Sequence, residues 1–132
     1  MGLIYLDACL VIYEVEMHPQ FQLPFRQAMA QARSATYAVS PLVKCECLVA
    51  PYKRSDPTLL RRFESFFAQL VLLPMLEADF IQAAQLRARF GLRTPDALHL
   101  ACAQRHQCEA LWTNDARLHS ASLGLAQNVF NS

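Results

Sequence analysis

Short apolar runs alternate with longer segments of mixed polarity along this chain. The runs predict strands, which lie at residues 3–6, 37–39, 71–74, 111–113 and, as an edge strand, 127–130. Strands that alternate with helices predict an α/β fold. We expect a three-layer sandwich in which a mainly parallel sheet of about five strands is flanked by helices.

The segments between the strands carry apolar residues at helical spacing. Ser40 and Asp56 each precede a proline, an order typical of a capping residue followed by the first helical position. Pro24 can open a helix, Pro51 is expected to stop one, and Gly91 is a typical helix stop. The predicted helices span residues 8–15, 25–33, 41 to about 49, 57–67, 77–90 and 97–105, and a helical turn is expected within 114–122. In the helix 77–90 the candidate core residues are Phe80, Ile81, Ala84 and Leu86.

Length and composition indicate one ordinary globular domain. The chain has 132 residues, so we expect a single domain over residues 1–132. Hydrophobic residues make up 54% of it, which is enough for a core, yet no apolar run approaches the roughly 20 residues of a membrane span. The N-terminus has no basic start and soon reaches Asp7, unlike a signal peptide. We therefore expect a cytoplasmic protein without a membrane segment.

The cysteines do not indicate a disulfide framework. There are five of them, and no two have CxxC spacing. Cys9 and Cys102 lie in apolar segments, which favours reduced, buried thiols of a cytosolic protein. A zinc site would need four ligands at closer spacing.

Four acidic residues lie where predicted strands or helices begin or end. They are Asp7, Glu46, Asp96 and Asp115. In an open α/β sheet, strand ends and helix starts meet at one edge, so four distant carboxylates can converge there. Carboxylates brought together resist joint ionisation, and a hard divalent cation such as Mg²⁺ relieves that repulsion through its preference for oxygen ligands.

Taken singly, most of these acids also have a structural explanation. Asp7, Asp96 and Asp115 could each lie at a helix start, where the helix dipole favours an anion. Glu46 is harder to explain, because it lies in an apolar stretch and Lys44 cannot face it on a helix. A buried carboxylate is costly alone, so we expect Glu46 to have a cation or a hydrogen-bond partner.

Other polar residues near the acids remain open to two interpretations. His99 lies one turn after Asp96 on a helix that is apolar on nearly all sides, where a hydrogen-bonded packing role is more common than a catalytic one. The net charge of +1 gives no strong global field for nucleic acid. Arg87, Arg89 and Arg93 are either a solvated helix face or local phosphate contacts.

The ordered set of motifs resembles the PIN domain family, and within it the VapC-like toxin ribonucleases of prokaryotic toxin–antitoxin pairs. The resemblance rests on the strand that ends in Asp7 and on Ser40 and Glu46 in the second strand-to-helix unit. It also rests on Thr-Pro-Asp-Ala-Leu-His-Leu-Ala at 94–101 and on Thr-Asn-Asp at 113–115. It covers residues 4–130, nearly the whole chain.

The resemblance implies a metal-dependent endoribonuclease that uses one or two Mg²⁺ or Mn²⁺ ions to hydrolyse RNA phosphodiester bonds. It implies metal-site residues Asp7, Glu46, Asp96 and Asp115, and supporting residues Thr113, Ser40 and Asn114. A cation of this kind activates water and stabilises the leaving oxygen, so no cysteine or histidine nucleophile is needed. Ala8 departs from the Ser or Thr that many members carry there, which removes one possible supporting hydroxyl.

The resemblance further implies partners: an RNA substrate of single-stranded or looped shape, a small antitoxin protein, and a second copy of the chain in a homodimer. The aromatic helix around residues 59–70, or the face of residues 11–13, could supply the dimer surface. Simple core packing explains the same apolar pattern equally well.

Other functions stay open from the sequence. A degenerate PIN domain could act as a protein-interaction module, and a PIN nuclease could act in RNA processing or on DNA. A receiver-like phosphoacceptor domain would want a lysine after a late strand, and none follows Lys53. Only three glycines occur, none clustered, which excludes a P-loop or a dinucleotide site.

Overall fold

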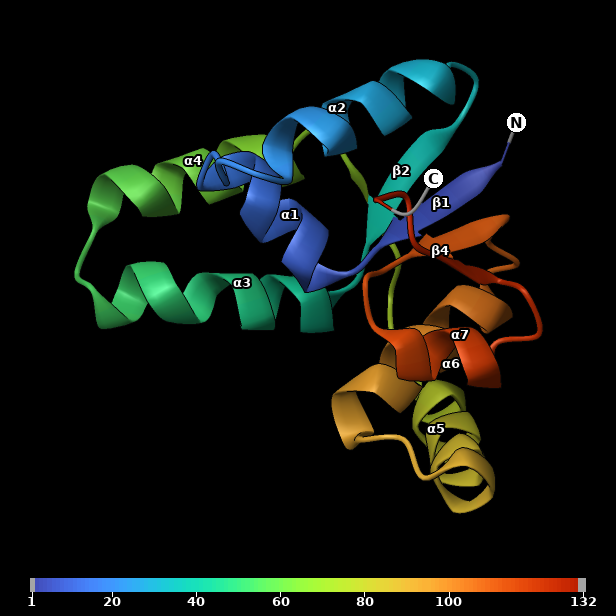
Figure 1. The fold of residues 1–132 in the computed structure, drawn as a ribbon. Coiled ribbons are helices and arrows are strands. Elements are labelled where there is room, and N and C mark those ends of the chain that lie inside the picture. The colour runs from blue at the N-terminus through green and yellow to red at the C-terminus, as the bar shows by residue number, and fades with distance from the viewer. Residues whose placement is uncertain (1, 131–132) are drawn as a thin grey trace.

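A five-stranded parallel sheet forms the centre of the computed structural model, which describes residues 2–130 (Figure 1). The strands are β1 (Leu3–Leu6), β2 (Thr36–Val39), β3 (Val71–Leu72), β4 (Ala110–Trp112) and β5 (Ala126–Gln127). Their order across the sheet is β3-β2-β1-β4-β5, and every neighbouring pair is parallel. The central strand is therefore the first in the sequence, and β4 returns to pair with it.

Seven helices connect and cover the strands in the described part of the chain. They are α1 (Ala8–Val15), α2 (Gln22–Gln31), α3 (Pro41–Lys53), α4 (Pro57–Phe67), α5 (Glu77–Phe90), α6 (Thr94–Arg105) and α7 (Ala116–Ala121). The connections β1 to β2 to β3 run one way across the sheet, and β3 to β4 to β5 run back. With right-handed crossovers this reversal sends α1–α4 to one face and α5–α7 to the other, as Figure 1 shows. The predicted three-layer α/β sandwich is confirmed.

Several predicted boundaries differ from the structure. Helix α3 continues past Pro51 to Lys53, because a proline near a helix end removes only one backbone hydrogen bond. Helix α2 begins two residues before Pro24, which is tolerated in a first turn whose N–H groups have no helical partner. The last strand lies at Ala126–Gln127 rather than 127–130, since β4 offers it only two paired positions. Val129 and Phe130 pack against the core instead.

The predicted core face of α5 is largely wrong. Phe80 and Ile81 are more than half exposed, and Ala84 is exposed as well. Only Leu86 of the four expected residues is buried. The buried stripe runs through Asp79, Ala83 and Leu86 because Asp79 forms an ion pair with Arg105 of α6, with Arg105 Nε 2.6 Å from its Oδ1. A buried carboxylate thus sets the rotation of the helix, which apolar spacing alone does not reveal.

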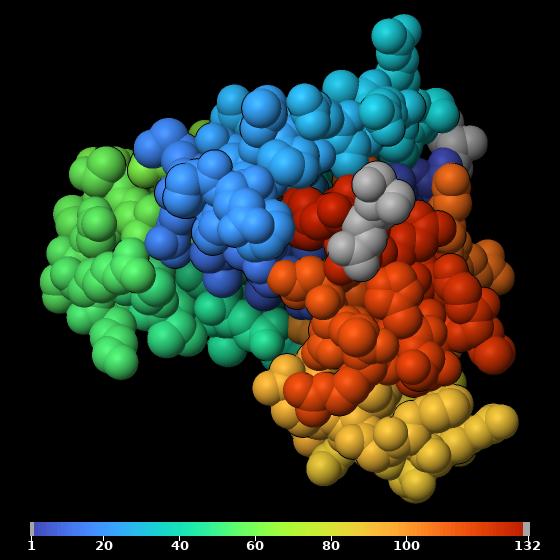
Figure 2. Space-filling model, in the orientation of Figure 1, coloured from blue at the N-terminus to red at the C-terminus, as the bar shows by residue number. Residues whose placement is uncertain are grey.

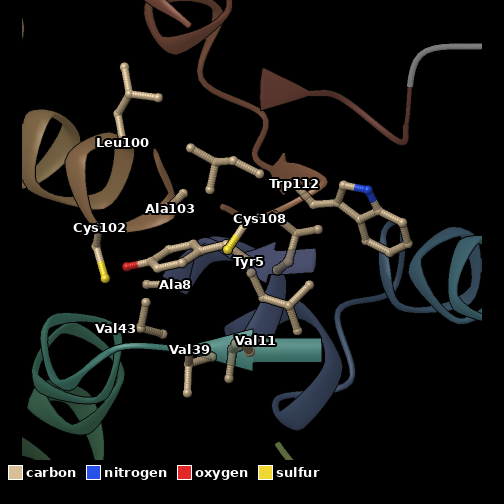
Figure 3. Close-up of a cluster of buried hydrophobic side chains, with 14 of the residues drawn as sticks. Tyr5, Ala8, Val11, Val39, Val43, Leu100, Cys102, Ala103, Cys108 and Trp112 are labelled. Atoms are coloured by element: carbon tan, nitrogen blue, oxygen red, sulfur yellow. The ribbon is translucent and has the colours of Figure 1, made fainter. Parts of the chain in front are cut away.

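The core lies on both sides of β1 and β4 (Figure 3). Tyr5 is fully buried, and its side chain reaches from β1 between α6 and α3. Helix α6 is buried from Asp96 to Ala103, which confirms the expectation from its apolar sequence. All five cysteines are free thiols; Cys47, Cys102 and Cys108 are buried, whereas Cys45 is exposed. Among residues 2–130, none of the helices combines the length and apolarity needed to cross a membrane.

Candidate metal centre

The predicted acids lie at the carboxyl ends of the two central strands. Asp7 directly follows β1, and Thr113 and Asp115 follow β4, its neighbour in the sheet. From β1 the chain turns towards β2, whereas β4 lies on the other side of β1. Open α/β sheets bind their ligands at such a switch point, in the crevice outside the carboxyl ends of the strands.

Asp7 is held in place by both of its carboxylate oxygens. Its Oδ1 accepts a hydrogen bond from the Ala8 N–H at 2.7 Å, which caps α1. Its Oδ2 accepts one from the buried Thr113 hydroxyl, also at 2.7 Å. The Thr113 oxygen in turn accepts the Asp115 N–H at 3.1 Å, so Thr113 joins the first and the last of the four acids.

Glu46 has the partner that its position in an apolar segment requires, and that partner is His99. His99 Nε2 lies 2.6 Å from Glu46 Oε1 and 3.8 Å from Asp7 Oδ1. The three side chains place one ligand atom each within 4.8 Å of one another. The Glu46 side chain is 34% exposed, so α3 presents it at the rim of the site rather than in the core.

Asp96 and Asp115 are joined by an arginine. Asp96 lies in the first turn of α6, and its Oδ2 is 3.0 Å from Arg93 Nε. Arg93 Nη2 lies 3.8 Å from Asp115 Oδ2, while Asp115 also caps α7 through the Arg117 N–H. The hydrogen bond and charge of Asp96 raise the pKa of the Arg93 guanidinium. Arg93 is therefore a permanent cation between two carboxylates.

The structure thus brings the four predicted acids into one network in two pairs. Asp7 and Glu46 meet at His99, Asp96 and Asp115 meet at Arg93, and Thr113 connects the pairs. Figure 2 shows the surface indented between α3, in teal to green, and the yellow-orange segment that begins α6. Glu46 belongs to the first of these elements and Asp96 to the second.

Two predicted supporting residues do not contact a carboxylate. Ser40 is fully buried, caps α3 and hydrogen-bonds the Tyr5 hydroxyl at 2.7 Å. Asn114 is exposed; its Oδ1 accepts from the Cys9 thiol at 3.3 Å and its Nδ2 donates to the Tyr13 hydroxyl at 2.7 Å. Burial, and then the charge of Asp7, raise the pKa of Cys9 to about 12, so this thiol beside the site is not a nucleophile.

Sequence reasoning missed one residue of this network, Tyr5, and left the roles of two others, His99 and Arg93, open. His99 is a hydrogen-bonded buried residue, as expected, but its partner is an acid of the site. Tyr5, read only as part of a strand, holds the other ring nitrogen of His99 at 2.6 Å. Of the three clustered arginines, Arg93 reaches the acids. Arg87 donates to the Leu92 carbonyl and Arg89 stacks on Phe90. The spacing of Asp96 and His99, one helical turn, was the available signal.

The donor set suits a hard cation. Carboxylate oxygens are the preferred ligands of Mg²⁺, and several of them here have a free lone pair beside their protein hydrogen bonds. A site closed by thiols would instead indicate zinc, and the buried cysteines lie outside this network. The geometry therefore fits a magnesium- or manganese-type centre.

Comparisons with known proteins agree with this architecture. A family model described as PIN domain matches residues 4–122. No curated protein sequence matches the chain. Among solved structures, VapBC2 from Rickettsia felis bound to a DNA fragment from its promoter is similar, with a TM-score of 0.81, 16% identity and 96% and 98% of the two chains covered.

Two further structures show the same fold. A toxin–antitoxin complex from Klebsiella pneumoniae has a TM-score of 0.78 and 20% identity, over 96% of this chain and 97% of the other. VapC20 from Mycobacterium tuberculosis, described as a toxin that cleaves the sarcin–ricin loop, has a TM-score of 0.74 and 11% identity, over 89% and 94%.

Proposed function

This chain belongs to the PIN domain family, and on that premise we propose that it is a metal-dependent endoribonuclease, the toxin of a type II toxin–antitoxin pair. The observation that carries the proposal is the carboxylate network at the ends of β1 and β4. Asp7 and Glu46 lie within 4.8 Å of one another together with His99, at the switch point of a fold shared with toxin structures.

The proposed ligands are Asp7, Glu46, Asp96 and Asp115, which would hold one or two Mg²⁺ or Mn²⁺ ions. A bound cation of this kind lowers the pKa of a coordinated water and stabilises charge on the phosphate and the leaving oxygen. One buried hydroxyl, that of Thr113, holds the Asp7 carboxylate and the backbone N–H of Asp115, and so links two of the proposed ligand residues. Such supporting hydrogen bonds to ligand carboxylates tune metal affinity.

Arg93 is the proposed phosphate contact. Its side chain is 63% exposed although it touches Asp96. A long, exposed guanidinium can turn from a carboxylate to an incoming phosphate, which it binds in a bidentate geometry. The site then combines carboxylates for a cation with an arginine for the backbone anion, which is the requirement of phosphodiester hydrolysis.

RNA is the proposed substrate, and the support is that VapC20, a protein of the same fold, is described as a toxin that cleaves the sarcin–ricin loop. The neighbours described as VapBC or toxin–antitoxin complexes support an antitoxin as the partner of this chain. We also propose a cytoplasmic location, where the chain would encounter both its RNA substrate and its antitoxin.

We also propose a homodimer. The two surfaces predicted for it are largely used within the chain itself. Leu59, Phe63 and Phe67 of α4 pack into the chain's own core, and Val11 is fully buried. Phe66 stays half-buried and could meet a second copy. Light scattering at micromolar concentration tests this directly, and a monomer would remove the claim.

The decisive experiment compares RNA cleavage by the purified protein in Mn²⁺, in Mg²⁺ and in EDTA. Asp7→Asn and Asp96→Asn should abolish cleavage and weaken cation binding. Asp56→Asn is the matched control, because Asp56 also caps a helix through its side chain but lies in the turn between α3 and α4, outside the network of the four acids. It should cleave like the wild type.

The other outcomes select the alternatives. No cleavage of RNA or DNA together with no cation binding would leave a degenerate PIN domain that acts as an interaction module. Cleavage of DNA, or cleavage of RNA without an antitoxin that inhibits it, would place the chain among DNA-directed or RNA-processing PIN nucleases.

A further inference from the structure

A continuous line of hydrogen bonds runs through the core from the start of α3 to Glu46. The Val43 N–H lies 3.4 Å from Ser40 Oγ, and Ser40 Oγ lies 2.7 Å from the Tyr5 hydroxyl. That hydroxyl is 2.6 Å from His99 Nδ1. His99 Nε2 completes the line at 2.6 Å from Glu46 Oε1. The three side chains between the ends, those of Ser40, Tyr5 and His99, are at most 1% exposed.

For a neutral ring, the direction of every bond in this line follows from its carboxylate end. An ionised carboxylate can only accept, so His99 Nε2 carries the hydrogen that Glu46 receives, and Nδ1 is left as an acceptor. The Tyr5 hydroxyl hydrogen then points to Nδ1, and the Tyr5 oxygen accepts from the Ser40 hydroxyl. At the other end the Val43 N–H can only donate to Ser40 Oγ, which is compatible with this direction.

The opposite tautomer leaves a buried group without a partner. If Nδ1 carried the hydrogen, it would donate to Tyr5, and Tyr5 would donate to Ser40. The Ser40 hydroxyl hydrogen would then have no acceptor among its contacts in the described residues, at a fully buried position. An unsatisfied buried donor is costly, so these hydrogen bonds favour the Nε2–H tautomer of His99 over the opposite one.

We propose that Ser40 and Tyr5 hold His99 as the Nε2–H tautomer, so that His99 is a positioning donor for Glu46 and not itself a metal ligand. The inference deepens the proposed function and rests on it for the role of Glu46. A ligand nitrogen must offer a lone pair, and in this tautomer Nε2 has none to offer. Its 2.6 Å bond occupies Oε1 of Glu46 and leaves Oε2 for a cation.

The alternative is a metal centre in which His99 Nε2 is a third ligand beside Asp7 and Glu46, since all three lie close together. The distances argue for donation instead. Nε2 is within hydrogen-bond length of Glu46 and too far, at 3.8 Å, from Asp7 Oδ1 for a second bond. The ring thus points its hydrogen at one carboxylate, and Asp7 is held separately by Thr113.

The first test reads the tautomer in the cation-free wild-type protein, by long-range ¹H–¹⁵N NMR correlation of the imidazole rings. The His99 signals are assigned by their loss in His99→Gln. A single Nε2–H tautomer is expected, and it should persist when Mg²⁺ is added. An Nδ1–H tautomer, or a change to it with Mg²⁺, would overturn the proposal. This measurement needs no RNA and no cleavage, so it stands or fails apart from the proposed nuclease activity.

The second test measures Mn²⁺ binding by calorimetry in variants of the line. Tyr5→Phe and Ser40→Ala should each weaken Mn²⁺ binding by about 10-fold, the scale of lost supporting contacts at metal sites. His99→Gln keeps an N–H donor and should bind more tightly than His99→Ala. Tyr37→Phe is the control: it also deletes a hydroxyl that hydrogen-bonds, to the Met29 carbonyl, but one outside the network. Equal Mn²⁺ affinity in Tyr5→Phe and Tyr37→Phe would contradict the positioning role.

Discussion

Thr113 donates a hydrogen bond of 2.7 Å to Asp7, a residue 106 positions earlier in the chain. The same Thr113 oxygen accepts the Asp115 N–H, so one hydroxyl sets the geometry of two proposed ligands. Thr113→Val should therefore lower cation affinity and cleavage by about 10-fold or more. It should also cost about 1 kcal/mol of unfolding free energy, because the part-buried Asp115 N–H and Asp7 Oδ2 lose their hydrogen-bond partner.

The Thr113 prediction is checked by Mn²⁺ calorimetry and urea unfolding. Thr113→Ser restores the hydroxyl and should recover most of the affinity. The control Thr58→Val removes an exposed hydroxyl on α4 and should change neither quantity. If Thr113→Val binds Mn²⁺ like the wild type, Thr113 does not orient a ligand.

Arg93 should oppose a cation and favour RNA. Its charge lies beside Asp96 and Asp115, so Arg93→Gln should tighten Mn²⁺ binding by about threefold through reduced repulsion. RNA binding should weaken. The slope of log Kd against log salt concentration should decrease by about one, the value for one lost phosphate contact. Arg89→Gln is a matched control from the same arginine cluster, since Arg89 stacks on Phe90 and not on an acid. Unchanged RNA affinity in Arg93→Gln would exclude the phosphate contact.

Asp79 should contribute acid-dependent stability. Burial alone would raise its pKa, but hydrogen bonds from Arg105 and from the Leu76 N–H outweigh burial and hold that pKa below its usual value near 3.8. The contribution is therefore complete above about pH 4 and is lost as the pH falls through the lower folded value. Asp79→Asn should lower the unfolding free energy by about 2 kcal/mol at neutral pH and flatten its fall in acid.

Thermal unfolding between neutral pH and pH 2 measures this effect. Asp56→Asn serves again as the comparison, because Asp56 caps α4 without an ion pair to an arginine. A parallel fall for Asp79→Asn and the wild type, with a constant gap down to pH 2, would show that Asp79 does not titrate in the folded protein as described.

The thiols should differ sharply in reactivity. Burial raises the pKa of Cys102 to about 12 and that of Cys108 to about 11, and it raises the pKa of Cys47 as well. Thiolate is the reactive form, so these three are protected both sterically and by protonation. Cys45 is exposed on α3. Iodoacetamide at pH 8 should label Cys45 first, and mass spectrometry of peptides should find Cys47, its near neighbour, modified only after unfolding.

Much of the fold and the outline of the site can be predicted from the sequence, because strand ends are local features. Asp7 and Asp115 follow apolar strands, and parallel strands bring their carboxyl ends together. The rotation of α5 cannot be predicted in this way, because it depends on one ion pair between Asp79 and Arg105, 26 residues apart. A non-local polar contact outweighs the apolar spacing of Phe80 and Ile81.

The same reason hides the role of His99. On the sequence it is one polar residue in an apolar helix, and its two partners lie on β1 and α3. Tyr5 is 94 positions away and Glu46 is 53. No local spacing connects the three. Their connection depends on the order of the strands, which places α6 and α3 on either side of the Tyr5 ring (Figure 3).

The strand order also has a consequence for synthesis of the protein. Residue 7 leaves the ribosome 106 residues before Thr113, and the strand that carries Thr113 to its side is the fourth of five. Until that strand emerges and inserts beside the first, Asp7 lacks its hydroxyl partner, and Asp115 is absent altogether. A nascent or prematurely terminated chain would thus carry an unfinished centre. For a protein proposed to attack RNA, translation itself would delay the onset of toxicity until the fourth strand has been made.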